Sequence, residues 1–361
     1  MKAFLHCCLL ALACVVSHAA DWVLITPDQV SRSAIENWKA EGFEAVVLIL
    51  DETNTAAMKT AAVPLANAGM RFHYWIEVGR NVSFAQAHPE WMASVGMHED
   101  WRKNFSKLPH ARTGEVVKAF PWVPINYNEA FFEHIKRVKR LLGDAPTNYS
   151  SVLLNHLQAG PSSCGCGNVQ CRWATDYHVP ATGTRVGDRA AAQFVQAVQT
   201  LVPNAPVVPV WTTECEHDDL PAARRADRRS TGLCGMVGCA TGSCPKEFAN
   251  QWESLAKEHR HPVALLALHN DFARTNAAFA QGPRWVPRTV AYVDDTLRAE
   301  GKTSFPRGRL WLVVQGGSPD EERAARRAAA NARVSNVIVS RVRLEQSFEP
   351  RIVRVGTPLK E

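Results

Sequence analysis

Three carboxylates stand at or near the ends of short apolar runs, where they could carry out acid–base chemistry. Asp51 follows the run AVVLIL, Glu77 lies in RFHYWIEV, and Glu214 ends PVVPVWTTE. Glycoside hydrolysis usually needs two carboxyl groups held a fixed distance apart, one as the acid and the other as the nucleophile or base. The sequence therefore predicts Glu214 as the acid/base and Glu77 or Asp51 as the second carboxylate.

Polar and aromatic side chains share the face of these runs that is expected to point inward. Side chains alternate along a strand, so residues of one parity lie on the same face. Burying unpaired polar groups is costly, so a set drawn from several strands favours a ligand site. The alternative for any one residue is a hydrogen-bonded plug inside the fold. The predicted substrate contacts are His73, Trp75, His156, Gln158, His269, Asp271 and Gln315, with Arg341 added if the last strand has the same parity.

Flat aromatic faces would complete such a site, because sugars stack on indole rings. We expect this role for Trp75, Trp91, Trp122 and Trp211. Tryptophan also fills protein cores, which is the alternative for each of them.

The first residues have the pattern of an export signal. Lys2 is followed by an apolar run over 3–16, and Ser17-His18-Ala19 offers small residues before a cut. We expect a signal peptide over 1–19 and a mature domain over 20–361, located in the periplasm or secreted. No later run is long enough to span a membrane. The formal net charge is +6 and the basic residues are scattered, so we expect no nucleic-acid partner.

Seven cysteines would remain after removal of the leader, and none has Cys-x-x-Cys spacing. Three disulfides with one thiol, a metal or cluster site, and a redox-active pair all stay open. No cofactor is expected, with a metal bound by the cysteine cluster as the alternative. We predict that the two cysteine-bearing segments are linked to each other, forming a rim above Gln158 and Glu214. The cysteines are Cys164, Cys166, Cys171, Cys215, Cys234, Cys239 and Cys244.

Eight apolar, β-rich runs alternate with helical stretches along the chain. This alternation predicts parallel strands joined by helical crossovers, and eight units predict a single (β/α)8 barrel of the TIM type. Long, cysteine-rich loops are expected after the third, fourth and fifth strands, at 79–127, 159–187 and 215–246. Those loops follow the carboxyl ends of the strands, where barrel enzymes have their sites. The predicted strands are 21–26, 45–50, 71–78, 151–158, 206–214, 263–271, 309–315 and 336–342.

Three further stretches resemble the uncharacterised exported bacterial barrels that are grouped as glycoside-hydrolase-like proteins. They are RFHYWIEVGRN (71–81), HPEWM (88–92) and WVPINYNEAFFEHI (122–135). The resemblance implies a carbohydrate-directed barrel with a poly- or oligosaccharide as its partner. In related glycosidase barrels an acidic residue commonly ends the fourth strand, whereas here LLNHLQ offers His156 and Gln158.

Two other functions stay open beside a glycoside hydrolase. A non-catalytic glycan-binding barrel is suggested by the absence of an acid at the end of the fourth strand. A metal or redox protein is suggested by the cysteines.

Overall fold

The computed structural model describes all eight predicted strands, in whole or in part, and five of the helices between them. The main described ranges are 20–79, 128–157, 187–212, 260–267, 306–315 and 318–342. Shorter described stretches lie at 81, 84, 87, 94–95, 116–119, 123, 125, 253–255, 290–291, 294–295, 297–299, 301–304 and 351–354.

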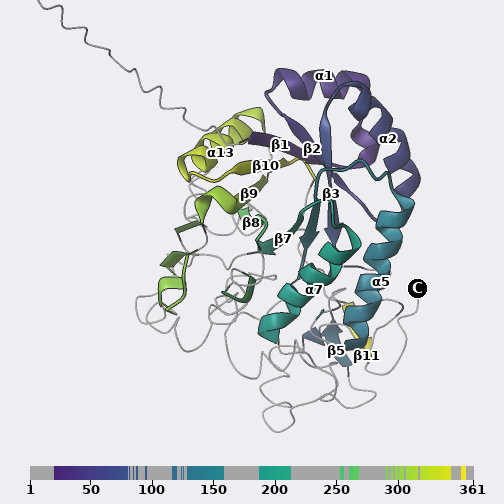
Figure 1. Cartoon of the computed structure of the whole chain (residues 1–361), viewed down its shortest axis with the longest axis vertical. Coiled ribbons are helices and arrows are strands. Elements are labelled where there is room, and N and C mark those ends of the chain that lie inside the picture. The colour runs from purple at the N-terminus through teal and green to yellow at the C-terminus, as the bar shows by residue number, and fades with distance from the viewer. Residues whose placement is uncertain are drawn as a thin grey trace, which may run out of the picture.

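Eight parallel strands close into one barrel, in the order β1-β10-β9-β8-β7-β6-β3-β2 (Figure 1). Each barrel strand pairs with the barrel strands that come before and after it in the sequence. The last one, β10, pairs with the first, β1, as a (β/α)8 barrel requires. All eight predicted strands are confirmed. Their bounds are Ala20–Ile25 (β1), Ala45–Ile49 (β2), Arg71–Glu77 (β3), Val152–Asn155 (β6), Val207–Thr212 (β7), Val263–Ala267 (β8), Leu310–Gln315 (β9) and Asn336–Ser340 (β10).

Helices cover the outside of the barrel, and local signals set their ends. Ser31 caps the first helix by accepting a hydrogen bond from the backbone N–H of Ala34 at 3.1 Å. Ser318 and Glu321 form a reciprocal capping box at the last one. Gly42, with φ of 84°, follows the first helix in a left-handed conformation. The helices are α1 (Arg32–Ala40), α2 (Thr55–Asn67), α5 (Asn128–Asp144), α7 (Gly187–Leu201) and α13 (Pro319–Asn331), with 3-10 turns at Pro27–Gln29 (η1) and Arg307–Arg309 (η4).

The strands separate two apolar layers. One set of side chains fills the barrel, including Trp22, Trp75 and Leu153. The other set, including Tyr74 and Ile76, packs between the strands and the helices. The predicted parity of β3 is therefore confirmed, because Trp75 points inward and its neighbours point outward.

Two other parities differ from expectation. In β6, Leu153 lies in the barrel interior and Leu154 faces the helices, so Asn155 has the inward parity that we expected for His156. In β8, Ala264 and Leu266 point inward, whereas the sequence suggested the odd-numbered residues of that run. Both runs are apolar on both faces, so the sequence pattern did not distinguish the two faces.

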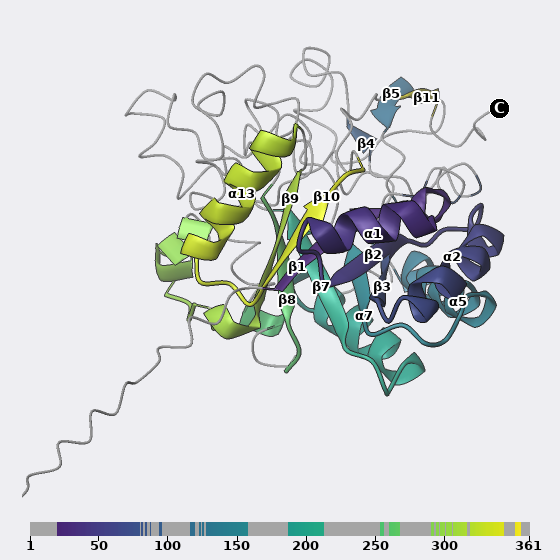
Figure 2. The same cartoon turned by 90° about the horizontal axis from the view of Figure 1, so that it is seen from above.

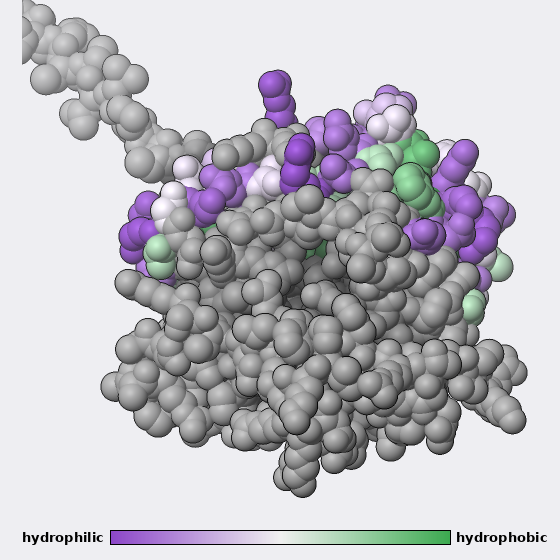
Figure 3. All heavy atoms as spheres, turned by 90° about the horizontal axis from the view of Figure 1, so that it is seen from below, coloured by the Kyte–Doolittle hydropathy of each residue, from purple (hydrophilic) through white to green (hydrophobic). Residues whose placement is uncertain are grey.

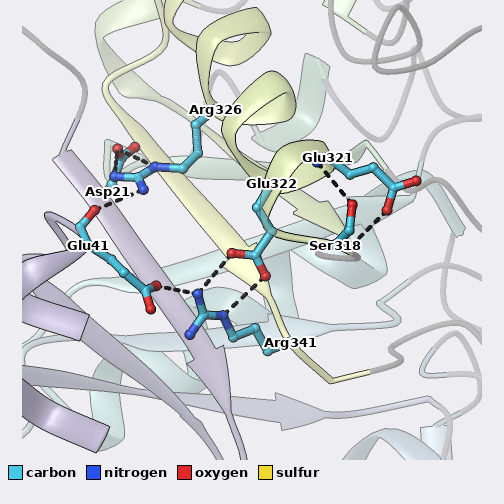
Figure 4. A network of polar contacts seen from close by, with 7 residues as sticks. All are labelled: Asp21, Glu41, Ser318, Glu321, Glu322, Arg326 and Arg341. Atoms are coloured by element: carbon cyan, nitrogen blue, oxygen red, sulfur yellow. Dashed lines mark hydrogen bonds and ion pairs between the residues drawn. The ribbon is translucent and has the colours of Figure 1, made fainter. Parts of the chain in front are cut away.

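Charged side chains fasten the first barrel unit to the last one (Figure 4). Arg326 of α13 donates to Asp21 Oδ2 at 2.7 Å and to the carbonyl oxygen of Glu41 at 3.0 Å. Arg341, which follows β10, donates to both oxygens of Glu322 at 3.1 and 2.9 Å and also pairs with Glu41. Arg341 therefore lies outside the barrel, and its suggested inward position was wrong.

A second, small sheet lies apart from the barrel strands and was not expected from the sequence (Figure 2). It consists of β4 (Ser94–Val95), β5 (Val116–Ala119) and β11 (Arg351–Arg354), paired antiparallel in the order β11-β5-β4. The register sets Arg351 opposite Ala119. The segment 351–354 thus returns to the segment that follows β3.

The described surface seen in Figure 3 is mainly hydrophilic, with a smaller hydrophobic area at one side. Val63 and Phe132 are the large hydrophobic side chains that are exposed among the described residues. Within those residues, no helix combines the length and the apolar character needed to cross a bilayer.

Candidate functional site

The candidate site lies at the carboxyl ends of three adjacent strands, β2, β3 and β6. Glu77 is the last residue of β3 and is level with Asn155, the last residue of β6. On the other side, Ile49 of β2 is level with Trp75. Because the strands are parallel, Asp51 follows β2 at the level of Glu77. The active sites of TIM barrels are built at this end of the strands.

The carboxylate of Glu77 accepts hydrogen bonds from two neighbouring side chains and contacts a third. Trp75 Nε1 donates to Oε1 at 2.8 Å. Asn155 Nδ2 contacts Oε1 at 3.2 Å and Oε2 at 3.0 Å. His156 Nδ1 contacts Oε2 directly. The Glu77 side chain keeps 23% of its surface exposed, so these neighbours enclose it only in part.

Each of these neighbours is fixed by the barrel. Trp75 precedes Glu77 by two residues, so both side chains lie on the same face of β3. The indole ring is fully buried in the barrel interior, which leaves it no open face for sugar stacking. Asn155 and His156 are also fully buried. The sequence-predicted residues Trp75, Glu77 and His156 are thus brought together here, and Asn155 is an addition that the parity argument had placed on the opposite face.

A buried arginine of α5 supports the same strand end and was missed by the sequence argument. Arg137 Nη1 donates to the backbone carbonyl oxygen of Glu77 at 2.8 Å. Its Nη2 donates to Glu52 Oε2 at 3.2 Å, and its Nε pairs with Oε1 of the same residue. A signal was present, since Arg137 lies in the helical stripe of Ala130, His134 and Leu141, all of which are buried.

The ion pair sets the charge of Glu52. Burial raises the pKa of this carboxyl group, but the hydrogen bond and the positive charge of Arg137 outweigh that effect. The net result is a pKa below the usual 4.5, so Glu52 is ionised at neutral pH. The loop after β2 is thereby tied to α5 and to the end of β3.

The described contacts of Asp51 belong to the turn that leads into α2. Its Oδ1 accepts hydrogen bonds from the backbone N–H of Thr53 at 2.8 Å and from Thr53 Oγ1 at 2.6 Å. Its own N–H donates to Asn54 Oδ1 at 3.0 Å. These are the bonds of a side-chain-stabilised turn, which gives Asp51 a structural task beside any chemical one.

His73 lies near the amino-terminal end of β3, away from Glu77 at the carboxyl end. Four residues of strand separate the two, which corresponds to about 13 Å. The imidazole stacks on Trp22 with ring centroids 4.0 Å apart, and its Nδ1 lies 2.7 Å from Ser151 Oγ. Burial, with the positive charge of Arg71, lowers the pKa of His73 to about 3. The residue is therefore a neutral packing group at physiological pH.

The remaining predicted site residues lie outside the described part of the chain. This holds for Trp91 and Trp122 and for the seven cysteines from Cys164 to Cys244, so the linked rim stays a prediction. Trp211 is described and is fully buried between the barrel and the helices. Among the described residues, no group of three His, Cys, Asp or Glu side chains could hold a metal ion. The other predicted residues that are not described are Gln158, Glu214, His269, Asp271 and the side chain of Gln315.

No protein-family model and no curated protein matches the sequence. Among solved structures, the chain is similar to the carboxyl transferase domain of Rhizobium etli pyruvate carboxylase, with 10% identity and a TM-score of 0.42 over 90% of this chain. It spans only 40% of that domain's chain. It is also similar to the glycoside hydrolase domain of PelA from Pseudomonas aeruginosa, with 11% identity and a TM-score of 0.40, covering 93% of this chain and 98% of that one. At such values the likeness carries no argument about activity, and the barrel assignment rests on the strand order.

Proposed function

We propose that the chain is an exported carbohydrate-active barrel that hydrolyses glycosidic bonds with a pair of carboxylates. The observation that carries the proposal is Glu77, whose partly exposed side chain lies at the carboxyl end of a barrel strand and contacts Trp75, Asn155 and His156. A carboxylate held by several fixed donors is preorganised to act on a ligand above it.

In this proposal Glu77 supplies the nucleophile or the base, and Glu214 supplies the acid. Glu214 follows β7 along the chain, and β7 is separated from β3 by β6 alone. Side chains that follow these two strands can face one cavity, as the two carboxyl groups of a glycoside hydrolase must. The leader over 1–19 would deliver the protein to the periplasm or the exterior, where polysaccharides are available.

The test is to profile the release of reducing sugars from a panel of poly- and oligosaccharides. Wild type is compared with Glu77→Gln and Glu214→Gln, which keep the shape of each side chain. Each change should lower turnover by about 10²- to 10⁴-fold, the usual contribution of a positioned acid or base. Glu36→Gln is the matched control, because Glu36 is an exposed acid on α1 with 64% of its side-chain surface accessible.

Equal product release by wild type and Glu77→Gln would show that the assignment is wrong. Saturable glycan binding without turnover would instead favour a glycan-binding barrel. One observation points that way, since the described end of β6 offers Asn155 and His156 to Glu77 in place of an acid.

A further inference from the structure

His156 has a backbone conformation that is uncommon for a residue other than glycine. Its φ is 60°, in the left-handed region, and Arg333 is the other described non-glycine residue with positive φ. A side chain in this region brings Cβ close to the backbone, so such residues persist only where the surroundings demand them. The surroundings here are ordered: the backbone N–H of Gly79 donates to the carbonyl oxygen of His156 at 3.0 Å.

The left-handed turn changes what the side chain can reach. Leu153 points into the barrel, Leu154 points to the helices, and Asn155 points inward again. Continued alternation would direct His156 toward the helices. Instead its Nδ1 contacts Oε2 of Glu77, and the imidazole is fully buried. The unusual backbone and the contact with the carboxylate are therefore one feature.

The donors and acceptors around Glu77 indicate which groups carry protons. An ionised carboxylate only accepts hydrogen bonds, and the indole N–H and the amide NH₂ only donate them. Trp75 and Asn155 thus both favour the ionised form of Glu77. The His156 contact fits the same arrangement when its Nδ1 carries a proton.

We infer that His156 is a positioning residue for Glu77, which it orients and holds ionised through Nδ1–H, so that Glu77 serves as the nucleophile or general base and not as the acid. The inference rests on the proposed function and adds the role of each partner. A nucleophile or base must be ionised before the substrate binds, whereas the acid must carry a proton.

Other charged groups also face this strand end and must stay unchanged in the test. Arg137 of α5 donates to the carbonyl oxygen of Glu77 and pairs with Glu52. Asp51 follows β2 at the same level. Changes at His156 leave all three side chains in place, so a difference between variants reports the imidazole.

Two variants separate the donor from the backbone. His156→Gly removes the imidazole and accepts the left-handed φ without strain. His156→Asn also tolerates this φ, and its amide places an N–H donor near the position of Nδ1. The readout is the ionisation of Glu77, followed by ¹³C NMR in protein labelled with [¹³C]glutamate. The Glu77 signal is assigned by its loss in Glu77→Gln.

We expect the titration midpoint of Glu77 to move up by about one pH unit in His156→Gly, since one charge-assisted hydrogen bond is lost. In His156→Asn the midpoint should stay near that of wild type. Identical midpoints in wild type and His156→Gly would overturn the inference. If His156→Gly does not fold, the ¹⁵N spectrum of wild type decides: a proton on His156 Nδ1 supports the inference, and a bare Nδ1 contradicts it.

Activity gives a second, separable readout. On a glycan that wild type cleaves, His156→Gly should lower kcat at nearly unchanged KM and shift the acidic limb of the pH profile upward, and His156→Asn should restore both. If no glycan is cleaved, the proposed function fails while the NMR titration still decides the role of His156. If Glu77→Gln is inactive but His156→Gly moves neither the titration nor the pH profile, the inference alone fails.

Discussion

Arg137 holds the end of β3 from outside the barrel, by donating from Nη1 to the carbonyl oxygen of Glu77 at 2.8 Å. The same guanidinium pairs with Glu52, which follows β2. One side chain of α5 thus connects two neighbouring strand ends at the level of the candidate carboxylate. A change at Arg137 should therefore affect both stability and the position of Glu77.

Replacing Arg137 with Gln should lower the free energy of unfolding by about 2 kcal/mol, measured in urea. Removal of one partner from a buried pair typically costs about 3–5 kcal/mol, but solvent screens part of this one. Arg137 is 5% exposed and Glu52 is 34% exposed in their side chains. Lys139→Gln, a change at an exposed residue of the same helix, is the control and should stay within about 0.5 kcal/mol.

The pair should also make stability depend on pH. The lowered pKa of Glu52 means that its contribution is fully present above the usual value of 4.5 and is lost as the pH falls through the lowered pKa. The difference in unfolding free energy between wild type and Glu52→Gln should therefore be constant from about pH 7 to 5 and shrink in more acidic solution. A difference that grows on acidification would contradict this.

Buried histidines should also lower the stability of the fold as the pH falls, beginning at a higher pH than Glu52 does. Burial, with the charge of Arg71, lowers the pKa of His73 from 6.5 to about 3, so the unfolded chain binds a proton that the folded chain does not. Stability is then lost as the pH falls below 6.5, at about 1.4 kcal/mol per pH unit for each such histidine. Burial likewise lowers the pKa of His134 to about 3. His73→Asn should lower the slope of unfolding free energy against pH between pH 6 and 4 by the contribution of one histidine. An unchanged slope would contradict this prediction.

The barrel could be predicted from the sequence because its signals are local. Apolar runs alternate with helical stretches, and Ser31 and Ser318 mark helix starts by capping chemistry that involves residues within one turn. The parity of β3 was also predictable, since His73, Trp75 and Glu77 alternate with bulky apolar residues.

The site was predicted only in part, for physical reasons that act through space. The left-handed φ of His156 breaks the alternation on which a parity argument depends. The pairing of β11 with β5 joins segments more than 200 residues apart, and no local pattern encodes it. The sequence suggests a surface position for Arg137, because α5 is rich in basic residues. Its helical spacing from the buried residues of α5 nevertheless places it on the inner face.

The charged contacts between the first and last barrel units should contribute measurably to the free energy of unfolding. Arg341 donates to both oxygens of Glu322, pairs with Glu41, and lies 5.3 Å from the ring centroid of Phe43. Arg341→Met keeps the aliphatic stem but leaves Glu322, 11% exposed, without this partner. We expect a loss of about 1–2 kcal/mol in urea unfolding.

The matched control for this change is Arg298→Met, because Arg298 and Asp295 form an exposed pair with 76% and 69% of their side chains accessible. Such pairs contribute little, so the change should stay within about 0.5 kcal/mol. Equal effects at the two arginines would mean that the closing contacts are no stronger than surface pairs.

The hydrogen bond from Trp75 to Glu77 can be separated from the packing of the indole ring by a pair of Trp→Phe changes. Trp75 Nε1 donates to Glu77 Oε1 at 2.8 Å. Trp22 lies in the same barrel interior, but its Nε1 is buried without a hydrogen-bond partner among the described residues. Trp22→Phe therefore reports the loss of ring volume and the altered stacking on His73, without the loss of a hydrogen bond to a carboxylate.

We expect Trp75→Phe to lower the free energy of unfolding by about 1–2 kcal/mol more than Trp22→Phe, the difference that one hydrogen bond to a carboxylate contributes. Each Trp→Phe change is then made separately in a Glu77→Ala background. The difference between the two effects should disappear there, because the acceptor is absent. Urea unfolding at pH 7 gives all the required values. An excess that survives in the Glu77→Ala background would assign it to packing and remove Trp75 from the partners that hold the carboxylate.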